Sequence, residues 1–98
     1  MTHFILSPAA KNDLDKIWNY TIKKWGEAQA ERYIRDIKAA CYDLVASNKN
    51  SLSAENIKSG YRKSLVGSHI IFFKIHSDGT INIIRILHQQ MDVLKYFD

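Results

Sequence analysis

The sequence predicts an α+β domain in which an antiparallel sheet of three to four strands packs on an N-terminal helical hairpin. Two stretches between residues 8 and 47 carry apolar residues at helical spacing, the region 61–88 is rich in Ile and Phe, and Asp78-Gly79 divides that region in two. These observations give the order β-α-α-β-β-β, followed by a short C-terminal helical segment. A chain of 98 residues fits one domain, residues 1–98.

The N-terminal half carries start and stop signals for two helices. Residues 2–6 are expected to form a short strand, and Ser7-Pro8 then supplies an N-cap and a proline at the first helical position. The apolar stripe of the first helix consists of Ala10, Leu14, Ile17, Trp18, Thr21 and Trp25, which we interpret as core. Gly26 ends this helix, and a second begins near Glu27, with Cys41 on its apolar face as a core residue. Because so few residues join them, the helices must run antiparallel.

The Asp78-Gly79 pair predicts a two-residue type I′ turn between two strands. That turn would pair Ile75 with Asn82, Phe73 with Ile84, Ile71 with Ile86, His69 with His88, Ile70 with Leu87, Phe72 with Arg85, Lys74 with Ile83 and His76 with Ile81. Both sheet faces would then be largely apolar. The helices cover one face, and the other needs the C-terminal segment, a partner, or both.

The remaining segments read as connections and one further strand. Residues 48–60 are expected to be a loop with a helical turn around Ala54–Ile57, followed by a strand from Tyr61 to Val66 and a tight turn at Gly67-Ser68. Residues 89–97 have loose helical spacing and are too short to be stable unless they dock on the sheet.

Composition limits the classes of function. With 46% hydrophobic and 24% charged residues, the chain should fold, and it has no apolar run of the ~20 residues that span a membrane and no export signal, which predicts a cytoplasmic protein. The net charge of +4 lies mainly in residues 49–88, which hold six basic and two acidic side chains. This favours an acidic partner, either a protein segment or nucleic acid. The sequence lacks a helix-turn-helix and a Gly-rich phosphate loop, so we expect no direct nucleic-acid binding.

Four stretches carry a family resemblance that extends over almost the whole chain. They are L-S-P-A-A-K-N-D-L-D-K-I-W-N-Y-T, W-G-E-A-Q-A-E-R-Y-I, G-Y-R-K-S-L-V-G-S-H-I-I-F-F-K-I and I-I-R-I-L-H-Q-Q-M-D. In this order and spacing the chain resembles the ParE branch of the RelE/ParE superfamily, the toxins of type II toxin–antitoxin systems. The loop after the second helix departs from the family pattern, because it lacks the proline and glycine that members often have there.

The resemblance implies a toxin neutralised by a cognate antitoxin whose disordered tail folds on it, with DNA gyrase as the target. The alternative is a RelE-like ribosome-dependent mRNA endonuclease. Those enzymes usually place an arginine where this chain has Ile70 and Ile71, and an Arg or His with a Tyr near the C-terminus, where this chain has Gln89-Gln90-Met91-Asp92 and then Tyr96. We therefore predict that the protein is not an enzyme. A toxin fold that binds its antitoxin and is inert towards the cell is the third hypothesis.

Two partner surfaces are predicted, with no catalytic residue, metal or cofactor. Antitoxin binding is assigned to Leu14, Trp18, Tyr33, Ile70, Phe72 and Leu87, with strand addition at an open sheet edge as a further mode. Target binding is assigned to Tyr61, Arg62, Lys63, Arg85 and His88.

Two features keep alternative interpretations. His69 and His88 form either an acid–base couple or a local hydrogen-bonded contact that ties the end of the sheet to the C-terminal segment through Asp92. Arg85 either stacks on Phe72 or holds an acidic group of a partner.

Overall fold

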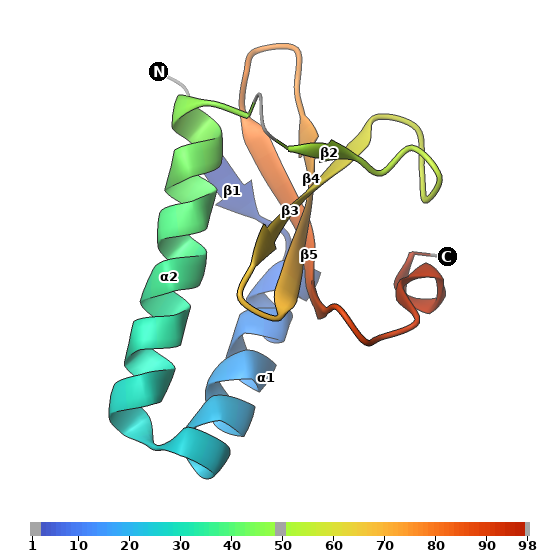
Figure 1. Cartoon of the computed structure of the whole chain (residues 1–98). Coiled ribbons are helices and arrows are strands. Elements are labelled where there is room, and N and C mark those ends of the chain that lie inside the picture. The colour runs from blue at the N-terminus through green and yellow to red at the C-terminus, as the bar shows by residue number, and fades with distance from the viewer. Residues whose placement is uncertain (1–2, 49–50, 98) are drawn as a thin grey trace.

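Two antiparallel helices lie against one face of a twisted five-stranded sheet in this computed structural model, which describes residues 3–48 and 51–97 (Figure 1). The elements are β1 (Phe4–Leu6), α1 (Pro8–Trp25), α2 (Glu27–Ala46), β2 (Leu52–Ser53), β3 (Tyr61–Val66), β4 (His69–Ile75), β5 (Ile81–His88) and a 3₁₀ helix, η1 (Val93–Tyr96). The α+β class and the short C-terminal helical segment are as predicted, and the predicted order β-α-α-β-β-β holds except for one additional strand, β2. Residue 2 of the predicted first strand, and residues 49 and 50 of the predicted loop, lie outside the described residues.

The helical hairpin begins and turns at the predicted residues. The Ser7 hydroxyl accepts a hydrogen bond from the Ala10 N–H at 3.0 Å, and Pro8 starts α1. Gly26 ends α1 with φ 93°, a backbone conformation open to glycine and strained for other residues, and its carbonyl accepts from the Ala30 N–H of α2. One glycine therefore both terminates one helix and opens the next.

The sheet is larger than predicted and mixed in direction. Its strand order is β1-β5-β4-β3-β2, with β1 parallel to β5 and the other pairs antiparallel. The predicted loop 48–60 does contain a turn at Ala54–Ile57, but it also contributes the two-residue edge strand β2. The two-residue strand β2 carries too little pattern to be recognised in the sequence, whereas β1 falls within the strand predicted for residues 2–6.

The predicted register of the β4–β5 hairpin is correct in one half and wrong in the other. The pairs from His69–His88 to Phe72–Arg85 occur as predicted, but Phe73 pairs with Ile83 and Ile75 with Ile81. The turn is a three-residue loop, in which the Gly79 N–H donates to the His76 carbonyl and Gly79 takes φ 90°. A β-bulge opposite Phe72 and Phe73 leaves Ile84 as the extra residue on β5. The extra residue compensates for the longer turn, so the pairs from Phe72–Arg85 to His69–His88 have the predicted register.

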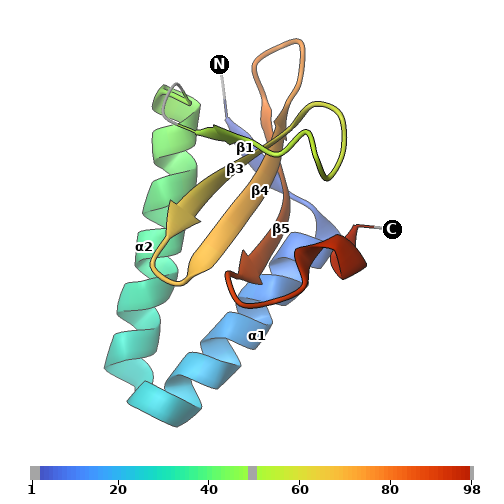
Figure 2. The same cartoon turned by 45° about the vertical axis from the view of Figure 1, so that its right-hand side comes forward.

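The two faces of the sheet carry separate cores. The main core lies between helices and sheet and consists of Ala10, Ile17, Ile37, Cys41, Leu44, Ile71, Phe73, Ile81, Ile83 and Ile86. On the opposite face, Ala54, Phe72 and Leu87 form a second cluster, against which Ile57, Val93 and Phe97 pack. The loop 51–60 and the C-terminal segment (residues 89–97) thus cover the second face, as Figure 2 shows for the C-terminal segment.

The buried position of Cys41, which raises the pKa of its thiol to about 11, agrees with its interpretation as a core residue. Within residues 3–48 and 51–97, neither helix is long and apolar enough to span a bilayer.

Candidate functional site

Four consecutive residues of β5 hold the first two turns of α1. The Ser7 N–H donates to the Ile83 carbonyl at 2.9 Å, and the Ser7 hydroxyl donates to the carbonyl of the bulged Ile84 at 2.6 Å. One turn further along α1, the Asp13 carboxylate accepts from the Ile86 N–H at 2.9 Å. Since β1 pairs with β5 only as far as Ile83, these bonds satisfy the edge of β5 beyond the end of β1.

Asp13 also holds Arg85 through a bidentate ion pair. The Arg85 Nε and Nη2 atoms donate to the two carboxylate oxygens at 2.8 and 2.7 Å, with the side chains only 18% and 6% exposed for Arg85 and Asp13. The hydrogen bonds to Asp13 raise the pKa of Arg85. The guanidinium carbon also lies 5.2 Å from the centroid of the Tyr96 ring. The aromatic neighbour of Arg85 is therefore Tyr96 instead of the predicted Phe72, and the acidic group that it holds within this chain is Asp13.

The open end of the β4–β5 hairpin is tied to α2 by the hydroxyl of Tyr33. That oxygen lies 2.6 Å from His69 Nδ1, donates to the Val66 carbonyl at 3.3 Å, and accepts from the Ser68 N–H at 3.2 Å. Gly67 turns beneath it with φ 55°, and a Cβ atom at Gly67 would lie 2.6 Å from the Tyr33 ring. Close approach and positive φ both require glycine here.

His69 and His88 do face each other, with ring centroids 5.2 Å apart. Desolvation, together with the nearby His88, lowers the pKa of His69 to about 4, so that His69 is neutral at pH 7. The His88 Nδ1 atom accepts from the Gln90 N–H at 3.1 Å. The histidines therefore make local contacts, to Tyr33 and to the C-terminal segment, but the contact to that segment runs through Gln90 and not through Asp92.

A groove of about 810 Å³ opens at this end of the molecule, between α1, the ends of β4 and β5, and the C-terminal segment. We call it the end groove. It is lined by Asp13, Lys16, Ile17, Tyr20, Thr21, Lys24, Trp25, Gln29, Tyr33, Ser68, His69, Arg85, Ile86, Leu87, His88, Gln90, Met91 and Tyr96. Trp25, which we expected in the core, is 65% exposed, and Tyr20 is 61% exposed. Lys24 Nζ lies 5.6 Å from the ring centroid of each.

A second, shallower groove of about 560 Å³ lies where α1 and α2 meet beside β1. We call it the flank groove. Its lining residues are Leu6, Lys11, Leu14, Asp15, Trp18, Ile34 and Lys38, so its apolar floor has a rim of mixed charge.

The residues predicted to bind the antitoxin do not form one surface. Leu14 and Trp18 line the flank groove, Tyr33 lines the end groove, and Ile70 is half-buried on the second sheet face. Phe72 and Leu87 are 1% and 2% exposed beneath the C-terminal segment. The C-terminal segment, one of the two covers expected for this sheet face, thus buries these two residues, and they are not open to a partner in this structure.

The residues predicted to bind the target are likewise divided. Arg85 and His88 line the end groove, whereas Tyr61, Arg62 and Lys63 lie together on β3, two strands away from β5. The Tyr61 ring packs against Phe97, and Arg62 donates to the Ser51 hydroxyl and carbonyl at 2.7 Å each. Arg62 thus fixes the loop that precedes β2.

Sequence reasoning missed Asp13 and the exposed flank of α1. Lys16, Tyr20 and Lys24 recur every four residues, which places them on one side of the helix, and this spacing was a readable signal. Asp13 gave none, because its role depends on β5, which lies 72 residues away along the chain.

The end groove presents lysine ammonium groups and exposed aromatic rings. Among the described residues, Asp13 is the one carboxylate that lines it, and Asp13 is engaged by Arg85 and the backbone of Ile86. In the described part of the chain, no three His, Cys, Asp or Glu side chains gather where they could hold a metal ion.

This fold and its two grooves define a small α+β protein that presents concave surfaces beside a helical hairpin. The family model of the ParE toxin of type II toxin–antitoxin systems, parDE, matches residues 4–93. The chain belongs to this family of toxins.

Relatives and solved structures agree with the assignment. The chain is 40% identical over 92 residues to Toxin ParE1 of Mycobacterium tuberculosis (strain ATCC 25618 / H37Rv), with 94% of each chain covered. It is 37% identical to Toxin ParE1 of Caulobacter vibrioides over the same share of both chains. A structure of the chromosomal ParDE system of P. aeruginosa has the same fold, with a TM-score of 0.75 at 20% identity over 90% of this chain and 95% of that one.

Proposed function

We propose that this toxin acts in the cytoplasm by binding DNA gyrase and inhibiting it, and that a cognate antitoxin neutralises it by folding on its surface. The family membership supports the proposal. The structural observation that favours binding over catalysis concerns Ile70 and Ile71, which stand where a RelE-like ribonuclease would carry an arginine. Both side chains are apolar, and Ile71 is fully buried in the main core. This point of the sheet therefore offers no positive charge to a substrate.

A supercoiling assay with purified toxin and gyrase tests the target. We expect supercoiling to fall as toxin is added and to recover when the toxin is first mixed with its antitoxin. Normal supercoiling at a large molar excess of toxin would refute gyrase as the target.

The ribonuclease remains a second candidate because His69, Arg85 and Tyr96 all line the end groove. Against it, Arg85 is already neutralised by Asp13, and the Nδ1 atom of neutral His69 is bonded to Tyr33. General acid–base catalysis needs groups that are free and have a pKa near the working pH. Transcripts cut by the toxin in a translation extract would favour the ribonuclease, and intact transcripts would remove it.

For the antitoxin we propose the flank groove as the main docking site. Leu14, Trp18 and Ile34 present apolar surface between two helices, a shape that accepts the apolar face of a partner helix. Lys11, Lys38 and Asp15 on its rim can pair with charges of either sign.

A second anchor for the antitoxin is proposed at the sheet edge. On the side of β3 away from β4, the described residues place no strand beside Ser64–Val66, since β2 pairs only with Arg62 and Lys63. Leu65 is exposed and pairs with half-buried Ile70 of β4. A strand added at this edge would therefore also cover apolar side chains.

Two tryptophans on one helix test the docking site. Trp18→Ala should weaken antitoxin binding by at least ~30-fold, because buried aromatic anchors contribute about 2 kcal/mol or more. Trp25→Ala is the matched control, since Trp25 lies in the end groove. The affinity of this variant for the antitoxin should stay within about threefold of that of the unmodified toxin. Calorimetry with the purified pair measures both, and equal losses for the two variants would refute the assignment.

A further inference from the structure

The two grooves lie on different flanks of α1. Lys16, Tyr20 and Lys24 are four residues apart and share the flank that faces the end groove. Leu14 and Trp18 share the flank that faces the flank groove. The buried residues Ala10 and Ile17, among others, lie between these flanks and pack on the sheet. A change on one flank can therefore be made without touching the other.

The end groove has a surplus of positive charge. Among residues 3–48 and 51–97, neither Lys16 nor Lys24 makes an ion pair, and the lining carboxylate of Asp13 is neutralised by Arg85. His69 adds no charge at pH 7, because its burial lowers its pKa to about 4. Among the described lining residues, the two lysines thus carry the positive charge that an approaching acidic group would meet.

Exposed aromatic rings stand beside these cations. Tyr20 and Trp25 flank Lys24. The Lys24 ammonium group lies 5.6 Å from each ring centroid and donates a hydrogen bond to the Tyr20 hydroxyl at 3.2 Å. Across the groove, Tyr96 lies over Arg85. Trp, Tyr and Arg are the residue types that contribute most to protein–protein binding energy, and here Trp25, Tyr20, Tyr96 and Arg85 line one concave surface.

We propose that the end groove is the surface with which the toxin grips its target, and that its occupant is an acidic protein segment carrying an apolar or aromatic anchor side chain. This inference rests on the proposed function, in which the toxin acts by binding. The acidic side chains of the segment pair with Lys16 and Lys24, and its anchor packs on the exposed aromatic rings that line the groove. The antitoxin occupies the flank groove, so the two partners use separate residues of α1.

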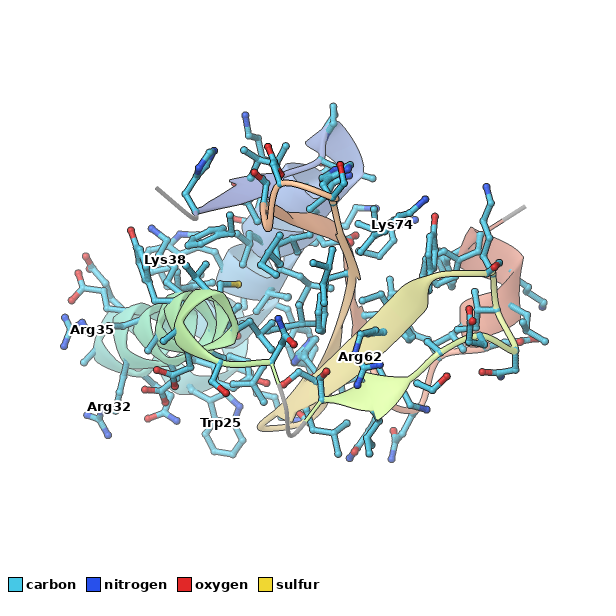
Figure 3. The ribbon with its side chains drawn as sticks, turned by 90° about the horizontal axis from the view of Figure 1, so that it is seen from above. Trp25, Arg32, Arg35, Lys38, Arg62 and Lys74 are labelled. Carbon is cyan, nitrogen blue, oxygen red and sulfur yellow. The ribbon has the colours of Figure 1, made fainter. Side chains whose placement is uncertain are left out.

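The distribution of charge favours protein over nucleic acid as the occupant. A nucleic-acid strand needs a continuous track of cations along its phosphates. Figure 3 shows Arg32, Arg35 and Lys38 around α2 and Arg62 and Lys74 on the sheet side, pointing in different directions. These five cations thus do not form a continuous track with one another, and the groove itself suits one short acidic segment.

Charge reversal at Lys16 and Lys24 tests the inference. The variant Lys16→Glu/Lys24→Glu should no longer arrest growth when expressed without antitoxin, and its half-inhibitory concentration against gyrase should rise at least tenfold. Its affinity for the antitoxin should stay within about threefold of the unmodified toxin. The matched control is Lys58→Glu/Lys74→Glu, which makes the same change in net charge at exposed positions outside both grooves and should arrest growth normally. Thermal unfolding by circular dichroism confirms that both variants fold.

Each other outcome has a defined meaning. The inference is overturned if the Lys16→Glu/Lys24→Glu variant still arrests growth, if it loses antitoxin affinity as well, or if the control variant loses growth arrest equally. Growth arrest that depends on the lysines, combined with normal gyrase supercoiling, would support the groove while refuting gyrase as the target. An unmodified toxin that does not arrest growth would overturn both proposals.

Discussion

Removal of the Asp13 carboxylate should be the most damaging single change on the surface between α1 and β5. Asp13 accepts three hydrogen bonds, two from Arg85 and one from the Ile86 N–H. Asp13→Ala would leave a mostly buried guanidinium without its counterion and a buried backbone N–H without an acceptor. Breaking a buried ion pair from one side costs about 3–5 kcal/mol.

The lower end of that range applies here. The Arg85 side chain is 18% exposed and keeps a longer contact, 3.4 Å, to the Tyr96 carbonyl, so some solvation compensates for the lost carboxylate. We expect a loss of about 3 kcal/mol in the free energy of unfolding, a large share of the ~5–15 kcal/mol that holds a domain of this size. The melting temperature should fall by roughly 12 °C or more, at ~4–8 °C for each kcal/mol.

Urea unfolding followed by circular dichroism measures this loss. Asp15→Ala, two residues away and exposed, is the matched control and should change the free energy of unfolding by less than about 0.5 kcal/mol. The double variant Asp13→Ala/Arg85→Met should be more stable than the sum of the single effects predicts, by roughly 1–2 kcal/mol, because it removes the orphaned charge. A cost below about 1 kcal/mol for Asp13→Ala, or strictly additive effects in the cycle, would refute the reasoning.

Three further predictions follow from the hairpin end and the C-terminal segment. The unfolded chain protonates His69 near pH 6.5 and the folded chain only near pH 4, so stability should fall as pH drops through this window, by about 1–2 kcal/mol after screening by solvent. Urea unfolding at pH 7 and 4.5 should show a smaller fall in His69→Gln, and an identical fall would contradict the assignment. Gly67→Ala should lower the free energy of unfolding by about 2–3 kcal/mol, and by less in a Tyr33→Ala background, where the clash with the ring is removed. Gly26→Ala is the control, because its added Cβ has no atom within 4 Å, and its cost should be the same in both backgrounds. Phe97→Ala should cost about 1–3 kcal/mol and increase binding of a hydrophobic dye, because the second cluster opens; unchanged dye binding would show that the ring does not cover Phe72.

Local rules predicted the helices and the far end of the hairpin. Ser7-Pro8 and Gly26 act on their nearest neighbours, so their roles could be read directly from the chain. The pairing of His69 with His88 was also correct, although the turn was not, because the turn and the bulge shift the register in opposite directions. A type I′ turn and a three-residue loop both accept Asp-Gly, and the sequence did not distinguish them.

Long-range contacts were beyond the reach of the same rules. The position of Asp13 on α1 looks like an ordinary polar site, and only β5 makes it a buried ion-pair partner. Trp25 follows the apolar stripe of α1 but lies past the end of the sheet, so it has nothing to pack on and remains exposed. The candidate grooves could not be derived from periodicity, because each is formed by segments far apart in the chain.

The extra residue at Ile84 has a consequence for how this hairpin can vary. A hairpin with a two-residue turn and no bulge would present His69 to His88 in the same way as this one does. Changes in length at the tip can be absorbed at Ile84 before they reach the opposite end, where the end groove lies. A change of one residue in the β4–β5 loop, matched by loss of the bulge, would therefore leave the register at the end groove unchanged.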